Sequence, residues 1–157
     1  MKLTQVKGNT WVAEGMEHIP FYKLPDGRCI LLDTGLRQEG DELEEALTAA
    51  GLTPAAILNS HSHVDHCGND RRFQEKYGTL IALTAPEAAM CCNLLTLKCY
   101  FLLLSPETVR QESSHMVLTP DRIIPPEDGP FSLLGAEFQI IHTPGHTVDH
   151  ICTRTPD

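Results

Sequence analysis

Three of the chain's eight histidines fall within six residues, in a segment that reads NSHSHVDHCGN from Asn59 to Asn69. The spacing is H-x-H-x-D-H and the residues that form it are His61, His63, Asp65 and His66. Imidazole nitrogens and carboxylate oxygens are common ligands of Zn²⁺. In an extended segment alternate side chains point the same way, so His61 and His63 can reach one ion. Asp65 and His66 lie further along and could face a second ion about 3.5–4 Å away.

The neighbours of this segment indicate where it lies in the fold. The apolar run 55–58 is long enough for a buried strand but too short for a helix. Asn69-Asp70 is typical of a helix N-cap. The motif therefore lies on a loop at the carboxyl end of a strand, where open α/β sheets bind their ligands. The alternative, a polar surface loop that happens to be rich in histidine, does not account for both the spacing and this context.

Three motifs resemble those of the metallo-β-lactamase superfamily. His61-x-His63-x-Asp65-His66 resembles its metal-binding signature, and the zincin signature H-E-x-x-H is absent. The segment 143–147 reads TPGHT and resembles the family's T-P-G-H-[ST] turn, whose histidine, here His146, completes the first metal site. A weaker match is the L-L-D-T-G of 31–35, which resembles the D-T-G that ends an early strand.

The resemblance implies an α/β protein with the four-layer αββα sandwich of that family. It also implies the metal ligands, which are His61, His63, Asp65, His66 and His146. Asp65 would in addition act in catalysis by orienting a metal-bound hydroxide. The expected cofactor is Zn²⁺, as one or two ions, with Fe or Mn as other candidates. By the same resemblance, Asp33 supports the metal loops through hydrogen bonds and is not a ligand.

The chain also departs from the family pattern. Such domains usually continue past the T-P-G-H turn to a G-D whose aspartate bridges both metals, and then to a last histidine. This sequence has no G-D after His146, and only His150 could join Asp65 and His66. We therefore expect a single partial domain over 1–157, mainly the N-terminal half of the fold with an incomplete second half. Its first metal site would be complete and its second site weak.

The implied function is a metal-dependent hydrolase whose zinc-bound hydroxide attacks an ester, thioester, lactone or related small substrate. β-Lactams and phosphodiesters belong to the same range of candidates. Two alternatives stay open: a non-catalytic metal-binding fragment, and a mononuclear iron protein similar to persulfide dioxygenases. Relatives that reduce oxygen with iron usually carry glutamate at the position of His63, so that class is disfavoured.

Composition limits the partners. A net charge of −9 opposes binding to nucleic-acid phosphates, and the chain is long enough for one domain with a core. The six cysteines include no C-x-x-C and no secretory signal precedes them, which favours free thiols and a cytoplasmic location. The apolar segment 94–104 is too short to span a bilayer. We expect a small-molecule substrate, no membrane and a possible homo-oligomer.

Periodicity and turn signals predict the remaining elements. Expected strands are 3–13, 21–24, 29–32, 55–60, 80–83, 122–124, 131–134 and 137–141, with a two-residue Gly135-Ala136 turn between the last two. Expected helices are 41–50, 70–77 and one from 86 to about 103, followed by a further segment to about 114. Thr84 and Glu87 have the spacing of a capping box, and the acidic run 41–45 is interpreted as a solvated face.

For several other histidines and one cysteine, the sequence favours no role in metal binding. We expect His142 to be packed or hydrogen-bonded, His150 to have a strand or surface role, and His115 to be structural; for His18 the context favours no role. Cys67 adjoins the motif, but the family has no ligand there.

An incomplete second sheet would leave part of the core without cover. The strand residues expected to lose cover are Ile57, Leu58, Leu80, Ile81, Leu83 and Ile140. Such exposure would favour self-association or a marginally stable fold.

Overall fold

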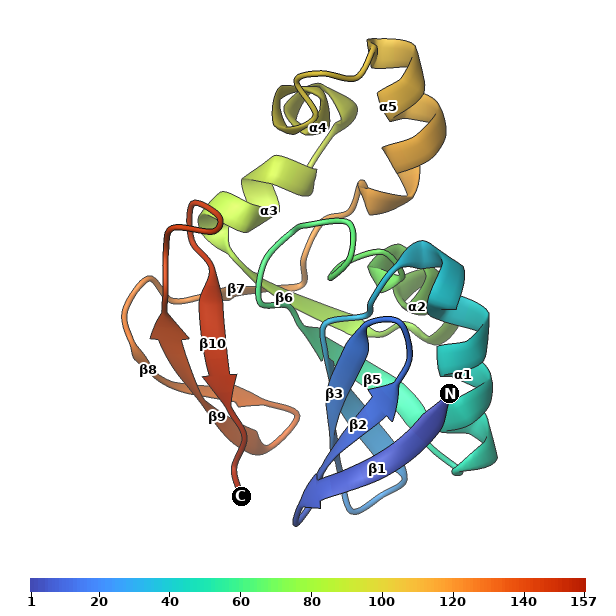
Figure 1. Ribbon diagram of the computed structural model, residues 1–157. Helices are drawn as coiled ribbons and strands as arrows, with labels where there is room; N and C mark the ends of the chain where they lie inside the picture. Colours follow the sequence, from blue (N-terminus) through green and yellow to red (C-terminus); the bar gives the residue numbers. More distant parts are fainter.

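The computed structural model describes residues 1–157 and contains two β-sheets packed face to face, with helices on the outer side of the larger sheet (Figure 1). The larger sheet has seven strands in chain order, which are β1 (Lys2–Lys7), β2 (Thr10–Glu14), β3 (His18–Lys23), β4 (Arg28–Leu32), β5 (Thr53–Leu58), β6 (Leu80–Thr84) and β7 (Arg122–Ile124). Pairing is antiparallel from β1 to β4 and parallel from β4 to β7. The α/β class expected from the sequence is confirmed.

The first strand expected at 3–13 is wrong, because the chain reverses within it. Gly8 has φ +50, a conformation that glycine adopts without steric cost, and it separates β1 from β2. The expected hairpin around Pro25-Asp26-Gly27 is present as β3 and β4.

The helices that connect the parallel strands of the large sheet lie where the apolar periodicity predicted them. The 3₁₀ turn η1 (Arg37–Glu39) leads into α1 (Gly40–Ala49), and α2 (Asp70–Tyr77) connects β5 to β6. Gly78, with φ +66, ends α2 in the left-handed conformation expected of a C-terminal glycine. Both helices cover the outer face of the large sheet, where Leu43, Leu47 and Phe73 are buried.

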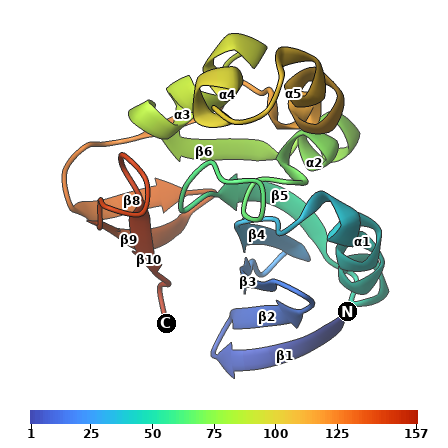
Figure 2. The ribbon, with the colours of Figure 1, turned by 45° about the horizontal axis from the view of Figure 1, so that its top comes forward.

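The single helix expected from 86 to about 103 is two helices. They are α3 (Ala85–Cys91) and α4 (Leu94–Tyr100), and α5 (Pro106–Ser113) with the 3₁₀ turn η2 (Ser114–Met116) follows. Asn93 is extended and its side chain accepts hydrogen bonds from the backbone N–H groups of Leu95 and Thr96, so it caps a new helix. Figure 2 shows α3, α4 and α5 together at one end of the large sheet, beyond β6. No helix combines the length and apolarity that crossing a bilayer requires.

The smaller sheet is antiparallel and has the order β10 (Ile151–Arg154), β9 (Ala136–His142), β8 (Gly129–Leu133). Its hairpin turn is Leu134-Gly135, not the predicted Gly135-Ala136. Both turn residues have positive φ, +51 and +84, as a type I′ turn requires.

The expected loss of core cover is wrong for five of the six residues named. Ile57, Ile81 and Leu83 are buried against the helices, and Leu58 and Ile140 are buried between the two sheets. Only Leu80 is partly buried. Cover is sufficient because three strands present Phe131, Phe138 and Ile151 to the inner face of the large sheet. The large exposed apolar side chains lie elsewhere, among them Leu95, Leu102 and Leu103.

The acidic run of α1 is not wholly solvated, because Glu44 is 8% exposed. Its carboxylate accepts hydrogen bonds from Arg72, Lys76 and Tyr77, and so it joins α1 to α2. Burial alone would raise the pKa of Glu44, but these donors outweigh burial and lower the pKa to about 2.

Glu44 therefore gives a prediction about stability and pH. A carboxyl whose pKa is lower in the folded state stabilises the fold above its unfolded pKa, and this contribution is lost as the pH falls through the folded pKa. Glu44→Gln should lower the free energy of unfolding at pH 7 by on the order of 1 kcal/mol, because Arg72 and Lys76 are partly exposed and water screens their interaction with Glu44. The difference from the wild type should shrink between pH 4.5 and about pH 2. Urea unfolding of metal-free protein measures it, with exposed Glu42→Gln as the control. A difference that is the same at pH 7 and pH 2.5 would contradict the assignment.

Candidate metal centre

The loop that carries the histidine motif starts at the end of β5 and is fixed by Asp33, at the end of the neighbouring strand β4. Asp33 Oδ1 accepts a hydrogen bond from the Ser60 backbone N–H at 2.7 Å, and Oδ2 accepts one from the Ser60 hydroxyl at 2.7 Å. Asp33 itself has φ +67, which is uncommon for a residue with a side chain. The supporting role expected of Asp33 agrees with these contacts.

The rest of the D-T-G segment holds the far end of the loop. The Thr34 N–H donates to the carbonyl of His66 at 2.7 Å, and the Thr34 hydroxyl donates to Asp70 at 2.7 Å. Asn69 precedes α2 as predicted, but its side chain does not cap the helix; its amide donates to the carbonyls of Thr34 and Leu36. A Cβ at Gly68 would lie 2.5 Å from the Gly35 carbonyl, so only glycine fits this crossing.

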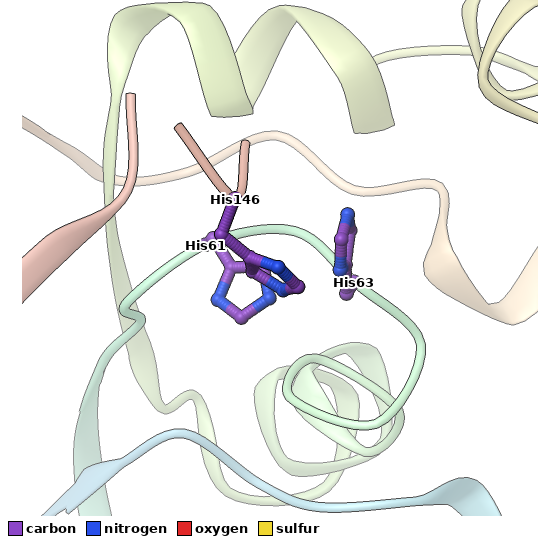
Figure 3. A group of neighbouring side chains, drawn as sticks. All are labelled: His61, His63 and His146. Carbon is purple, nitrogen blue, oxygen red and sulfur yellow. The ribbon is translucent and has the colours of Figure 1, made fainter. Parts of the chain in front are cut away.

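Three histidines converge on one point (Figure 3). His61 and His63 extend from the loop after β5, and His146 extends from the turn between β9 and β10. One ring nitrogen from each lies within 4.8 Å of the others. The ring centroids are 4.4 Å apart for His61 and His63, and 4.6 Å apart for His63 and His146. The structure thus brings together the three residues that the sequence predicts for the first metal site.

The protonation and burial of these rings fit a metal ion. His61 is 1% exposed; its Nδ1 lies 2.9 Å from the Ser60 hydroxyl, but its buried Nε2 has no hydrogen-bond partner. Buried polar atoms are rarely left without a partner, and a metal would supply one. Burial, with the neighbouring His66 and His63, lowers the pKa of His61 to about 4, and burial beside His146 lowers that of His63. Neutral imidazole is the form that binds metals.

Asp65 and His66 lie beside this group. The Nε2 of His66 is 3.6 Å from Asp65 Oδ2, and its ring centroid is 4.1 Å from that of His61. Its Nδ1 pairs with Asp33 Oδ2 at 2.8 Å. Burial would lower the pKa of His66, but the Asp33 hydrogen bond and charge raise it overall. Asp65 and His66 stay predicted ligands of a second ion, to which they bring two donors.

Two more histidines, His142 and His150, lie near the turn that carries His146. His142 is hydrogen-bonded as predicted, through Nδ1 to Asp149 at 2.8 Å and Nε2 to the Pro125 carbonyl at 3.0 Å. His150 was expected to have a strand or surface role, and it was also the one residue that could join Asp65 and His66; its ring lies 5.0 Å from that of His61. Its Nδ1 contacts the Thr143 hydroxyl at 2.7 Å. Cys67 is buried beneath the loop, which raises the pKa of its thiol well above the usual value.

Two residues of the site were not identified from the sequence. Glu87 was assigned to a capping box with Thr84, but the Thr84 side chain makes no cap hydrogen bond, and Glu87 contacts the metal loops instead. Tyr100, at the end of α4, lies with its ring 5.0 Å from that of His63, and burial raises the pKa of its phenol to about 12. The capping-box spacing predicted a local role for Glu87, so its contacts with the metal loops were missed. The position of Tyr100 depends on the break between α3 and α4 at Asn93, which the sequence analysis did not predict.

A cavity of about 110 Å³ adjoins the histidines. Its lining residues are Ser62, His63, Glu87, Met90, Tyr100, His146, Thr147 and Val148. They come from the metal loop, from α3 and α4, and from the turn after β9. A small molecule in this cavity would contact two of the three predicted ligands.

The sequence model of the metallo-β-lactamase superfamily matches residues 8–157, and the chain belongs to this superfamily. Among curated proteins it is similar to the hydroxyacylglutathione hydrolase of Klebsiella pneumoniae, with 29% identity over 127 residues, 81% of this chain and 38% of that protein. A hydroxyacylglutathione hydrolase of Xylella fastidiosa strain 9a5c is 32% identical over 127 residues, 81% of this chain and 37% of that protein.

Solved structures show the same fold. The FEZ-1 metallo-β-lactamase of Legionella gormanii has a TM-score of 0.78 at 17% identity, covering 99% of this chain and 58% of that one. The BJP-1 enzyme of Bradyrhizobium japonicum has a TM-score of 0.75 at 17% identity, covering 99% and 56%. The expected family resemblance and fold are confirmed, and the chain spans about two fifths of these curated relatives and just over half of these structures.

The geometry predicts unequal effects for two histidines of one turn. His146→Ala removes one of three converging ligands and should weaken Zn²⁺ binding by about 100-fold or more, or about 2.8 kcal/mol. His142→Ala removes a ring that contacts Asp149 and Pro125 and should leave the affinity within about twofold. Competition with a chromophoric chelator measures both. Equal losses for the two variants would mean that His142 has been wrongly excluded as a ligand.

A second prediction concerns stoichiometry. A tight zinc site takes about four ligands, and Asp65 with His66 brings two. Titration of the chain with Zn²⁺ should therefore show one strong equivalent, and a second that binds at least about tenfold more weakly. Elemental analysis after gel filtration checks this result. Two equally tight equivalents would show that His150 or another donor completes the second site.

Proposed function

We propose that the chain is the metal-binding portion of a metal-dependent hydrolase that cleaves a small ester or thioester, with thioesters preferred. The observation that carries the proposal is the convergence of His61, His63 and His146 beside a small cavity. The preference for thioesters is supported by the two hydroxyacylglutathione hydrolases that resemble the chain over 81% of its length.

In this proposal some residues bind the metal ion and others position the attacking water. His61, His63 and His146 would hold Zn²⁺ as neutral imidazoles, with Fe and Mn as alternative ions. A bound zinc ion polarises a carbonyl and lowers the pKa of a coordinated water to about 7. Asp65, whose side chain is 42% exposed, would accept a hydrogen bond from the attacking water and so orient it. His66 is held by Asp33, and its Nε2 lies 3.6 Å from Asp65 Oδ2, so that the two side chains together could hold a second ion.

The cavity supports a small acyl group as the part of the substrate nearest the metal. Met90, Tyr100 and Val148 give it an apolar side, while His63 and His146 lie on the side of the metal. The Tyr100 phenol stays protonated at neutral pH and can donate a hydrogen bond to a substrate oxygen. A net charge of −9 disfavours nucleic-acid substrates, so the proposed partner is a small molecule.

Turnover of matched substrates tests the proposal. Zinc-loaded chain is given a hydroxyacyl thioester of glutathione, the corresponding oxygen ester and a chromogenic β-lactam, and each is followed by its ultraviolet absorbance. The thioester should be hydrolysed fastest. His146→Ala and Asp65→Asn should each lower its kcat/KM by about 100-fold or more, because one removes a metal ligand and the other the group that orients water.

The controls separate the proposal from metal binding without turnover. His142→Ala should hydrolyse the thioester at the wild-type rate, since its ring lies outside the convergent group. If zinc-loaded wild-type chain binds its ion but hydrolyses none of the three substrates, the chain is a metal-binding segment without activity of its own.

A further inference from the structure

The three predicted ligands of the first site belong to different sheets. His61 and His63 follow β5 of the large sheet, whereas His146 lies between β9 and β10 of the small sheet. The distance between the two loops must be held for the three nitrogens to stay within 4.8 Å of one another. The backbone provides one link, because the Ile151 N–H donates to the carbonyl of Ser60 at 3.0 Å.

One buried carboxylate from a third element contacts both loops. Glu87, on α3, is 2% exposed. Its Oε2 accepts hydrogen bonds from the Ser62 backbone N–H at 3.0 Å and from the Ser62 hydroxyl at 2.6 Å. Its Oε1 accepts one from the Asp149 N–H at 3.2 Å. Ser62 lies between His61 and His63 in the sequence, and Asp149 is three residues beyond His146.

The hydrogen bonds of Glu87 favour a fixed distance between the two loops. Burial alone would raise the pKa of Glu87, but the side chains of Ser62 and Thr147 and the backbone N–H groups of Ser62 and Asp149 outweigh burial and lower it, so the group is ionised. Hydrogen bonds to a carboxylate are shorter and about twice as strong as those between neutral groups. Because the two oxygens of one rigid group bind the two loops separately, a shift of either loop lengthens a charge-assisted bond.

We propose that Glu87 is a positioning residue of the metal centre, which sets the separation of the T-P-G-H turn from the H-x-H loop and thereby the affinity and geometry of the bound ion. The inference rests on the metal binding of the proposed function, but not on hydrolysis. Glu87 itself is not among the converging ligands, which are His61, His63 and His146. Its oxygens accept hydrogen bonds from Ser62 and Asp149 instead.

Glu44 offers a matched control for a purely structural role. It is also a helical, nearly buried glutamate with several donors, but all of them come from α2 and none from a metal loop. Glutamine keeps the shape of either residue. At position 87 its amide oxygen can still accept from Ser62, but its NH₂ group cannot accept from the Asp149 N–H, so one of the two links is broken.

The experiment compares Glu87→Gln with Glu44→Gln. Zn²⁺ affinity is measured by competition with a chelator, the coordination geometry by the visible spectrum of Co²⁺ in the site, and stability by melting of the metal-free chain. Glu87→Gln should weaken Zn²⁺ binding by about 10- to 100-fold, as loss of such supporting partners does, and should change the Co²⁺ bands in position and intensity. Glu44→Gln should melt at a lower temperature with unchanged affinity and spectrum.

Three results would overturn the inference. The first is an affinity for Glu87→Gln within about twofold of the wild type, with the wild-type Co²⁺ spectrum. The second is an equal loss of affinity in Glu44→Gln, which would show that general destabilisation explains the effect. The third is a wild-type chain that binds neither ion, which would remove the metal centre as well. By contrast, a chain that binds zinc normally but does not hydrolyse thioesters leaves the role of Glu87 intact.

A second variant covers the case in which Glu87→Gln does not fold. Ser62→Ala removes only the hydroxyl donor at 2.6 Å and leaves the backbone link. We expect a smaller loss of Zn²⁺ affinity, about threefold, in the same direction. An unchanged affinity in this variant would contradict the proposal.

Discussion

The packing of the small sheet on the large one is the contact on which the candidate metal centre depends. His61 and His63 are neighbours in the sequence, but two imidazoles alone make an incomplete site. The third, His146, reaches them because β9 and β10 bury Phe138, Ile140 and Ile151 against the inner face of the large sheet. Apolar burial at about 25 cal/mol per Å² thus provides the energy that holds a polar site together.

Two carboxylates then fix the positions of the metal-binding loops more closely than the packing of the sheets does. Asp33 holds the metal loop from the β4 side through Ser60 and His66, and Glu87 holds it from the α3 side through Ser62. Burying a carboxylate is unfavourable unless donors surround it. The donors to Asp33 are groups of the metal loop, and those to Glu87 come from the metal loop and from Asp149 beyond the T-P-G-H turn. The left-handed backbone of Asp33, φ +67, costs about 1 kcal/mol or more, a strain that the surrounding hydrogen bonds can sustain. The same hydrogen bonds therefore hold the metal loop in place and satisfy the buried carboxylates.

Features decided by local sequence could be predicted, and those decided by distant contacts could not. The motif loop, the helix at 70–77 and the hairpin at Pro25-Asp26-Gly27 depend on near neighbours, and the structure has them. The spacing at Thr84 and Glu87 satisfied a local rule, yet Glu87 binds Ser62 and Asp149, which are 25 and 62 residues away. In the same way, the sequence named His150 as the one residue that could join Asp65 and His66 but favoured a strand or surface role, and the ring lies 5.0 Å from that of His61.

The burial of the core residues also depends on distant contacts, so it could not be judged from the number of strands expected in the second sheet. Ile57 and Leu58 are adjacent in the sequence and face opposite sides of β5. One is buried by helices that the sequence predicts, and the other by a three-stranded sheet whose packing it does not predict. The expected exposure of Leu58 and Ile140 was wrong because a small sheet with Phe131 and Phe138 is thick enough to exclude water from them.

These relations imply that metal binding and sheet packing are thermodynamically linked. A ligand that binds only the folded chain stabilises it by RT ln(1 + [L]/Kd), and here the ligating nitrogens come from both sheets. An ion held by His61, His63 and His146 would therefore act as a link between the sheets, in parallel with Glu87 and the apolar interface. The buried Nε2 of His61 has no partner within the protein, so an ion bound there would also remove the cost of an unsatisfied buried group.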